Sequence, residues 1–308
     1  MHKTAKYVKI KLRIRGKKII LDLMNMRTFL KCFLLIIFIW SGNTTMASGK
    51  TINSLAMLFN LNGKTAIITG ASQGLGKQFA IILNKAGARV ILASRDIDKL
   101  NAFSKELKNS KAIQMDVANS ASVKAAFAAL EEAGEKIDIC INNAATEALT
   151  PVFSEDDNGD FERVMQTNVM GVWYVTKAVA NHMKSHKING SIINISSVNG
   201  DSFPYKELTA YAASKAAVIH MTKSLVTELS QYKIRINTIN PGPVQSDLLG
   251  SPNKHDPNFW KDKIPAGFIA EPSYLDGLIL YLASNSASKY VTGATFAIDG
   301  GISWGGKS

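Results

Sequence analysis

Residues 65–76 have the sequence TAIITGASQGLG, in which a short β-forming run leads through a glycine-rich turn into a helical pattern. Glycine is needed where the backbone turns tightly and approaches a pyrophosphate without a Cβ atom in the way. The helix that follows offers free N–H donors and the positive end of its dipole. Glycine-rich turns alone are common, but one between the first strand and first helix of a βαβ unit predicts a dinucleotide-phosphate loop. The predicted contacts in this loop are Gly70, Ser72, Gln73, Gly74, Leu75 and Gly76.

From Lys64 onward, short β-rich runs alternate with amphipathic helical patterns. Strands are expected at residues 65–69, 89–93, 112–115, 137–141, 192–195, 234–239 and 295–298. Helices are expected at residues 74–85, 97–107, 120–133 with Ser120 as the N-cap, 161–183, 211–230 and near 274–282. This order predicts an α/β fold, a single Rossmann-like, doubly wound, seven-stranded parallel sheet with helices on both faces. Ligands of such a sheet bind at the carboxyl ends of its strands.

The positive charge of the chain is concentrated at one end. The 308 residues carry a net charge of +12, and residues 1–50 hold 11 of the 36 Lys and Arg but one of the 24 acidic residues. The remainder is nearly neutral, so we expect no nucleic-acid partner, which only the basic run Lys3–Lys18 would favour. The two cysteines, Cys32 and Cys140, exclude a disulfide framework. No Cys/His cluster has metal-ligand spacing, so no metal site is predicted.

Residues 1–56 are expected to form a basic and hydrophobic extension of a Rossmann-like domain at residues 57–308. Within residues 27–47, a basic start, the apolar run Cys32–Trp40 and a small-residue sequence resemble a signal peptide or an anchor, and we favour an inner-membrane anchor over export. The nine apolar residues fall short of the ~20 that span a bilayer. Two alternatives stay open, an overlong reading frame that starts as late as Met57 and a disordered basic tail. The domain itself is expected in the cytoplasm, with membrane contact only through residues 27–47.

The second expected strand ends at Ser94, Arg95 and Asp96, and these residues bear on the choice of cofactor. NAD-binding folds usually place an acid ~20 residues after the glycine-rich turn, where it binds the 2′-hydroxyl of the adenosine ribose. Here Ser94 takes that position and Arg95 follows it. A guanidinium grips a 2′-phosphate through charge-assisted hydrogen bonds. The sequence therefore favours NADP over NAD, although an inward-turned Asp96 would favour NAD.

Tyr211 and Lys215 begin the second long helix and share one face of it, because they are one turn apart. A lysine ammonium beside a phenol stabilises the phenolate and lowers its pKa from ~10, which makes the tyrosine a general acid or base near neutral pH. An isolated Tyr-xxx-Lys pattern is common and more often places a packed ring beside an exposed lysine. Ser197, however, follows a central strand at the edge where ligands bind, and Asn168 lies in the preceding helix.

These motifs, in this order, resemble the short-chain dehydrogenase/reductase family over roughly residues 58–301. The chain is similar to the family's 3-oxoacyl-carrier-protein reductases and to sugar dehydrogenases such as gluconate 5-dehydrogenase. The resemblance is carried by Thr69–Gly76 (TGxxxGxG), Asn142–Ala145 (NNAG, with Ala145 in place of Gly), Asn168, Ser197, Tyr211–Lys215 (YxxxK) and Pro241–Ser246 (the PG motif after a strand).

The resemblance implies an NAD(P)-dependent oxidoreductase acting on CH–OH groups. It would transfer hydride between the nicotinamide and the ketone or secondary alcohol of a small molecule, a 3-oxoacyl thioester or a sugar or polyol. Tyr211 would pass the proton, Ser197 would polarise the substrate oxygen, Lys215 would lower the pKa of Tyr211 and hold the nicotinamide ribose, and Asn168 would keep a relay water in place. A homotetramer is also implied. Beyond the phosphate loop, the expected cofactor-binding residues are Ser94, Arg95, Asp116, Val117, Asn143, Ala144, Ala145, Tyr211, Lys215, Pro241, Gly242, Val244 and Ser246.

Two alternatives accompany this hypothesis. Ser197 and Tyr211 are fourteen positions apart, one more than the family pattern leads us to expect, so Ser196 is an alternative to Ser197. A catalytically silent nucleotide-binding or scaffold protein with the same fold is the competing function. The complete set of Asn168, Ser197, Tyr211 and Lys215 argues against it, since drift usually erases the catalytic Tyr or Lys first.

Overall fold

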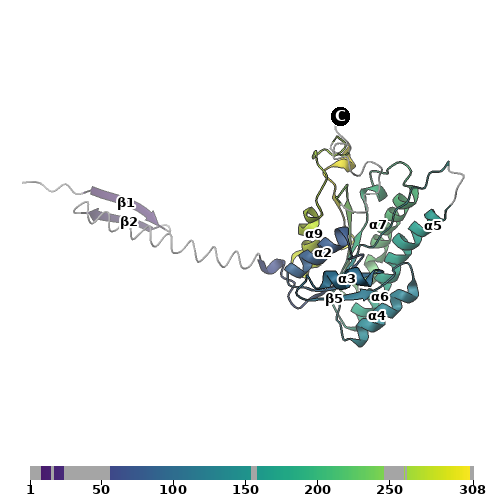
Figure 1. The fold of residues 1–308 in the computed structure, drawn as a ribbon. Coiled ribbons are helices and arrows are strands. Elements are labelled where there is room, and N and C mark those ends of the chain that lie inside the picture. Colours follow the sequence, from purple (N-terminus) through teal and green to yellow (C-terminus); the bar gives the residue numbers. More distant parts are fainter. Residues whose placement is uncertain are drawn as a thin grey trace, which may run out of the picture. The chain divides into compact units, whose positions relative to one another are not determined.

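The computed structural model describes residues 8–14, 17–23, 56–153, 158–245, 260 and 262–305. Two compact units make up the chain, Met1–Met57 and Leu58–Ser308 (Figure 1). The first unit contains an antiparallel pair of strands, β1 (Val8–Ile14) and β2 (Lys17–Leu23), with Val8 opposite Leu23 and Ile14 opposite Lys17. Basic and apolar residues alternate along β1, a period of two that is typical of a strand. These two strands were not among those predicted from the sequence.

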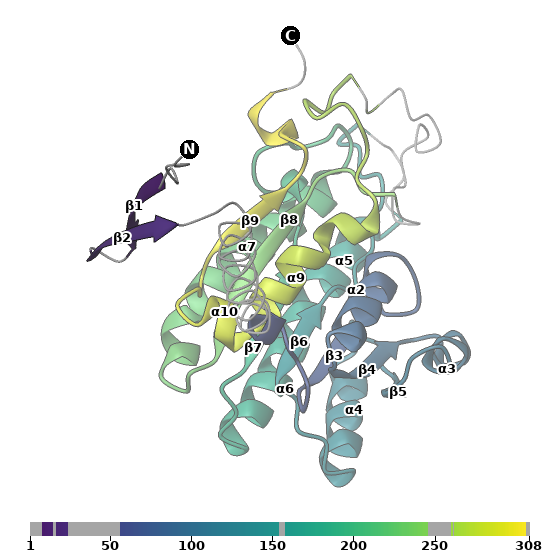
Figure 2. The same cartoon turned by 90° about the vertical axis from the view of Figure 1, so that its left-hand side faces the viewer.

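A seven-stranded sheet organises the second unit, and all of its strand pairs are parallel, which confirms the predicted fold (Figure 2). The strand order is β5-β4-β3-β6-β7-β8-β9, so the chain turns back between β3 and β6, where ligands of doubly wound sheets bind. The strands are β3 (Thr65–Thr69), β4 (Arg89–Ser94), β5 (Ser110–Gln114), β6 (Ile139–Asn142), β7 (Ser191–Ile195), β8 (Arg235–Pro241) and β9 (Thr295–Ile298).

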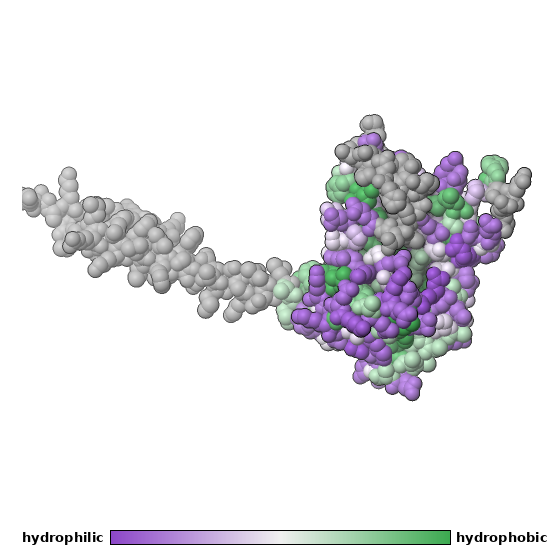
Figure 3. Space-filling view, in the orientation of Figure 1, coloured by the Kyte–Doolittle hydropathy of each residue, from purple (hydrophilic) through white to green (hydrophobic). Residues whose placement is uncertain are grey.

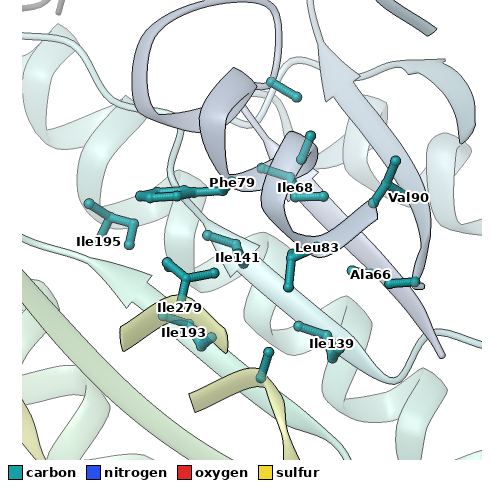
Figure 4. Packing of buried hydrophobic residues seen from close by; sticks show 14 of the residues in the cluster. Ala66, Ile68, Phe79, Leu83, Val90, Ile139, Ile141, Ile193, Ile195 and Ile279 are labelled. Atoms are coloured by element: carbon teal, nitrogen blue, oxygen red, sulfur yellow. The ribbon is translucent and has the colours of Figure 1, made fainter. Parts of the chain in front are cut away.

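Helices cover both faces of the sheet, as predicted, and each face has its own apolar core. On one face, Phe79 and Leu83 pack with Ile279 against strand residues such as Ile68 and Ile141 (Figure 4). The helices of this face are α2 (Gly74–Lys85), α3 (Ile97–Ser104) and α9 (Asp276–Ala283). The other face carries α4 (Ser120–Glu132), α6 (Gly171–Ser185) and α7 (Thr209–Ser230). Short helices α5 (Asp160–Met165) and α10 (Asn285–Ser288) complete the unit.

Two expected helices differ in detail from the structure. The N-cap of α4 is Asn119 rather than Ser120, because the Asn119 side chain accepts hydrogen bonds from the N–H groups of Ala121 and Ser122. The single helix expected at 161–183 is three pieces, with the π-helical turn Gln166–Met170 between α5 and α6. A π-turn of this kind widens a helix locally and often marks a functional position.

The surface of the second unit is mostly polar on the face shown in Figure 3, with apolar residues in small groups among the polar ones. Among the residues that the structure describes, no helix has the length and hydrophobicity needed to cross a membrane. The anchor expected at residues 27–47 lies outside the described residues.

Candidate active site

The glycine-rich loop joins β3 to α2 with the backbone geometry that a phosphate needs. Gly70 and Gly74 have φ angles of +66° and +53°, a region that side chains disfavour. Gln73 precedes the helix in an extended conformation, and its side chain does not cap the first turn. The N–H groups of this turn therefore point outward together with the positive end of the dipole. The loop fits the pyrophosphate of a dinucleotide on these grounds.

The loop is fastened to the end of β6 by hydrogen bonds that involve predicted site residues. Thr69 Oγ1 accepts from the N–H groups of Asn143 and Ala144, both at 3.0 Å. Asn143 Nδ2 donates in return to the carbonyl oxygens of Thr69 at 3.0 Å and Gly70 at 3.3 Å. Thr69 was absent from the predicted contacts although it opens the TGxxxGxG motif. Its hydroxyl holds together the two strand ends on which the cofactor would rest.

At the end of β4, the structure separates the roles of the two charged residues. Asp96 is the N-cap of α3, accepting from Lys99 N at 3.0 Å, and it pairs with the Lys99 ammonium at 3.3 Å. The hydrogen bond from the Lys99 backbone holds the pKa of Asp96 below its ordinary value. Arg95 is exposed and, with Asp116 at the end of β5, lines a depression of about 620 Å³. The acid that would favour NAD is therefore engaged by the helix, whereas within the described residues no hydrogen bond or ion pair engages the Arg95 guanidinium.

Asp116 and Val117 follow β5 and are both tied into the framework. The Asp116 carboxylate accepts from Ala118 N at 3.0 Å, and its own N–H donates to Ser122 Oγ. Val117 packs against Gly171, where an added Cβ would lie 2.9 Å from Val117 Cγ2. Gly171 thus lets α6 approach the end of β5 closely, directly after the π-turn.

The side chains of Ser197, Tyr211 and Lys215 meet at the carboxyl end of β7. The Ser197 side chain lies close enough to the Tyr211 phenol to lower its pKa, and its Oγ accepts from Asn199 N at 3.1 Å. Lys215 Nζ lies 5.5 Å from the centre of the Tyr211 ring and donates to the carbonyl oxygen of Ile195 at 2.9 Å. Ser196, the alternative to Ser197, is buried and donates its hydroxyl hydrogen to the Lys215 carbonyl at 2.7 Å. Only one of the two serines therefore contacts the tyrosine.

The electrostatics of this group differ from the sequence-based expectation. Burial raises the pKa of Tyr211 above its ordinary value, the nearby Glu147 carboxylate raises it further, and the hydrogen bond with Ser197 lowers it. Burial lowers the pKa of Lys215 to about 8, against an upward effect of Glu147. The lysine was expected to lower the pKa of Tyr211, but its ammonium is directed at the Ile195 carbonyl and sits over the ring. Burial and the Glu147 charge both favour the protonated phenol of Tyr211 over the phenolate.

Asn168 lies in the π-turn and is fully buried, with its side chain bonded on all sides. Its Oδ1 accepts from Thr146 N at 2.9 Å, and its Nδ2 donates to the Thr146 carbonyl at 2.9 Å and to Ser214 Oγ at 3.0 Å. Ser214 Oγ donates in turn to the Tyr211 carbonyl at 2.7 Å. The side chain clamps the Thr146 segment to the helix that carries Tyr211. The relay water expected at Asn168 stays a prediction. Sequence reasoning missed Ser214, although it stands next to Lys215.

The segment after β8 closes the remaining side. An added Cβ at Gly242 would lie 2.7 Å from Asp299 Cα, so glycine permits a close approach of β8 to the end of β9. Pro241 is the last residue of β8, and buried Val244 pairs with Ala270. Ala145 is half-buried after β6. Ser246, the remaining predicted contact, lies outside the described residues.

One cluster in the described part of the chain has the residue types of a metal site, Glu131 with His182 and His186, whose candidate ligand atoms lie within 4.8 Å of one another. The two histidines are one helical turn apart, a spacing that the sequence-based prediction of no metal site did not include. Glu131 accepts from both rings, at 2.8 Å from His182 Nδ1 and 2.7 Å from His186 Nε2. Ile137 N donates to His182 Nε2 at 3.2 Å, so this nitrogen is unprotonated and Nδ1 carries the hydrogen. A cation on Nδ1 would displace that hydrogen, so the cluster suits a hydrogen-bonded link between α4 and α6.

This link predicts a pH-dependent stability. Burial lowers the pKa of His182, so the folded state prefers the neutral ring and the unfolded state binds more protons. The contribution of His182 to the free energy of unfolding should therefore be fully present above pH ~6.5. Below that pH the free energy of unfolding should fall, by at most ~1.4 kcal/mol per pH unit. Urea unfolding between pH ~7.5 and ~5.5 measures it. His182→Gln should flatten the dependence, while His220→Gln, at an exposed position of α7, should not. Equal slopes in both variants would assign the dependence to other groups.

A doubly wound parallel sheet with an uncapped glycine-rich helix start and a Ser–Tyr–Lys group at its carboxyl edge defines a nucleotide-dependent oxidoreductase of the Rossmann type. The family model for short chain dehydrogenases matches residues 64–257, and the chain belongs to this family.

Its relatives match over nearly their whole length. Oxidoreductase UcpA of Salmonella typhimurium is 40% identical over 254 residues, 78% of this chain and 95% of the relative. The 3-oxoacyl-acyl-carrier-protein reductase FabG of Vibrio cholerae is 33% identical over 246 residues, 79% of this chain and 98% of the relative. A gluconate 5-dehydrogenase from Burkholderia cenocepacia, solved with NADP and tartrate, superposes with a TM-score of 0.76 at 31% identity and covers 81% of this chain and 99% of its own.

Proposed function

We propose that this protein is an NADP-dependent oxidoreductase that transfers hydride between the nicotinamide and a ketone or secondary alcohol of a small molecule. The observation that carries the proposal is the meeting of Ser197, Tyr211 and Lys215 at the carboxyl end of β7, beside the uncapped start of α2. The competing hypothesis of a catalytically silent protein has no support among the relatives, which are named as an oxidoreductase, a reductase and a dehydrogenase. Bound cofactor would supply the hydride.

Each side chain of the group has a defined task in this proposal. Tyr211 donates its proton to the oxygen of a ketone substrate, a direction that suits a phenol held protonated by burial. Ser197 holds and polarises the same oxygen, because its hydroxyl is close enough to Tyr211 to affect the pKa of the phenol. Lys215, with a pKa of about 8, remains mostly charged at neutral pH, and its ammonium, held at the Ile195 carbonyl, is placed to bind the nicotinamide ribose. Asn168 positions these groups through Thr146 and Ser214.

Arg95 is proposed as the reader of the 2′-phosphate of NADP. The guanidinium is exposed at the end of β4, and the competing carboxylate of Asp96 is committed to the first turn of α3. Ser94 adds a hydroxyl at the same strand end. The NADP complex of the Burkholderia gluconate 5-dehydrogenase supports the same cofactor.

Arg95→Ala should weaken NADPH binding roughly 10–100-fold, the size of a lost charge-assisted hydrogen bond pair, and leave NADH binding nearly unchanged. Fluorescence titration of the full chain with each nucleotide measures both affinities. Lys99→Ala, which removes a nearby cation paired with Asp96, is the matched control and should leave the NADPH affinity within about threefold. If NADPH affinity survives in Arg95→Ala, the assignment of the phosphate site to Arg95 is wrong.

Two finer proposals concern the assembly and the first unit. A homotetramer is supported by the partly exposed aromatic residues Phe161 and Trp173 on α5 and α6, which are helices of the kind that pair between subunits. Residues 27–47 are proposed as a membrane-anchoring segment of a catalytic domain that otherwise faces the cytoplasm. An overlong reading frame is the alternative for residues 1–56, and N-terminal sequencing of the natural protein distinguishes the two.

A further inference from the structure

The Ser197 hydroxyl is held by the turn that follows it. Ser197 is the N-cap of the 3₁₀ turn Val198–Gly200, and its Oγ accepts a hydrogen bond from Asn199 N at 3.1 Å. A hydroxyl has one hydrogen and two lone pairs, and the bond from Asn199 N occupies a lone pair. The hydrogen of Ser197 therefore remains for donation toward Tyr211 or a substrate oxygen. The position of Asn199 N decides in which direction that hydrogen points.

The turn itself is held from two sides. On one side the Asn199 side chain fastens it to the following loop, because Oδ1 accepts from Tyr205 N at 2.7 Å. On the other side Gly200 lies directly against α7, where an added Cβ would come 2.5 Å from Ala216 N. A shift of the loop at Tyr205 therefore moves Asn199, and with it the donor that orients the Ser197 hydroxyl.

The position of Tyr205 depends on a residue far along the chain. The Tyr205 ring packs against Trp260, with the ring centres 5.8 Å apart and the ring planes at 41°. Trp260 is only 6% exposed, so its indole is packed inside the protein rather than offered to solvent. Both rings belong to one apolar cluster that includes the residue directly after Ser197. The other members of this cluster are Val198, Phe203, Ile264, Ile269 and Ile302.

The segment that carries Trp260 is anchored as well. The Trp260 carbonyl accepts from Ile264 N at 2.9 Å, and the Ile264 side chain is buried. Two residues further on, Ala266 N donates to the Gly300 carbonyl at 2.9 Å, just beyond the end of β9. A continuous path of contacts therefore leads from the end of β9 through the two rings and Asn199 to the Ser197 hydroxyl.

The orientation of this hydroxyl matters for the proposed reaction, because Ser197 is the group that polarises the substrate oxygen. Loss of one preorganised donor costs ~10²–10³-fold in kcat, and a displacement of ~1 Å can cost ~10²-fold. Ser197 also lowers the pKa of Tyr211, which is the effect of a hydroxyl that donates toward the phenol oxygen. Building on the proposed function, we propose that Asn199, Tyr205 and Trp260 are positioning residues that aim the Ser197 hydroxyl at the substrate oxygen.

The test uses the full-length enzyme with NADPH and a panel of ketones, 2,3-butanedione, ethyl acetoacetate and D-fructose. Asn199→Ala removes the acceptor of the Tyr205 N–H and should lower kcat roughly 10–100-fold, while the NADPH affinity stays unchanged. Asn199→Asp keeps an acceptor oxygen at the same place and should restore most of this loss. Asn181→Ala is the matched control and should leave kcat unchanged, since Asn181 is exposed on α6 and donates to the Lys177 carbonyl of its own helix.

The ring contact is tested at Trp260. Trp260→Ala should lower kcat roughly tenfold, because the Tyr205 ring loses the surface that it packs against. Trp260→Phe keeps an aromatic ring in this place and should stay within about threefold of the wild type. Trp304→Ala removes a tryptophan that is 92% exposed and should leave kcat unchanged.

A second readout separates positioning from a merely structural role. Because Ser197 lowers the pKa of Tyr211, release of its hydroxyl in Asn199→Ala should shift the pH profile of 2,3-butanediol oxidation by NADP to higher pH. An unshifted profile, an equal loss in Asn199→Asp, or wild-type kcat in Asn199→Ala overturns the inference while the proposed function stands. Wild-type kcat in Trp260→Ala excludes the two rings from it. A wild type that binds NADPH and reduces no ketone of the panel contradicts the proposed function and this inference with it.

Discussion

Tyr211→Phe should lower kcat/KM for ketone reduction at least ~1000-fold, the largest single effect expected in this protein. The substitution keeps the ring that packs against Ala148 and Val164 and removes only the proton that the substrate oxygen would receive. Proton transfer by a positioned side chain typically accelerates a reaction 10²–10⁴-fold. In the variant only the Ser197 hydroxyl, a weaker proton donor, remains at this position. Steady-state kinetics at saturating NADPH measure the loss.

Two controls make this result specific. Fluorescence titration should give an NADPH affinity within about threefold of the wild type, because the phosphate loop and Lys215 are untouched. Tyr232→Phe removes the same hydroxyl from a 40%-exposed tyrosine after the end of α7 and should not change the kinetics. A Tyr211→Phe variant that binds NADPH and turns over like the wild type would exclude Tyr211 from the mechanism. The hypothesis of a catalytically silent protein would then be favoured.

The order of strands and helices could be predicted because each element has a local sequence pattern. The bounds of β3 and β9 match the prediction, since each is a short β-forming run between turn residues. The edge strand β5 was placed two residues late, because Ser110 and Lys111 join it through backbone pairing with β4 and carry no apolar signal. Ser197 and Tyr211 were predicted because they lie in motifs at a strand end and at a helix start, and Asn168 because it matches a family position inside the helix before them.

What the sequence did not predict depends on contacts between distant residues. Glu131 meets His182 across 51 positions, and only the packing of α4 on α6 brings them together. The pKa of Tyr211 depends on its burial and on Glu147, neither of which a YxxxK spacing encodes. The role of Asp96 as the N-cap of α3 could have been predicted from the sequence, because an Asp just before a helical pattern is a favoured N-cap.

Gly76→Ala should lower NADPH affinity at least ~100-fold and destabilise the fold by ~1–3 kcal/mol. Gly76 lies in the first turn of α2, and a Cβ there would come 2.2 Å from the carbonyl oxygen of Gly70 and 2.6 Å from Asn143 Nδ2. The first of these atoms is backbone, so the loop itself must move to relieve the contact. That movement breaks the bonds by which Asn143 and Thr69 hold the phosphate loop on the end of β6.

Gly277→Ala is the matched control, because Gly277 also lies in a helix, α9, but among the described residues no atom outside the backbone of that helix lies within 4 Å of the added methyl group. Alanine is a better helix former than glycine, so this variant should be more stable by up to ~1 kcal/mol and bind NADPH as the wild type does. Thermal unfolding and nucleotide titration of the two variants compare the same chemical change at two places. If Gly76→Ala behaved like Gly277→Ala, the glycine-rich loop would not be the phosphate site, and the cofactor would have to rest on the strand ends alone.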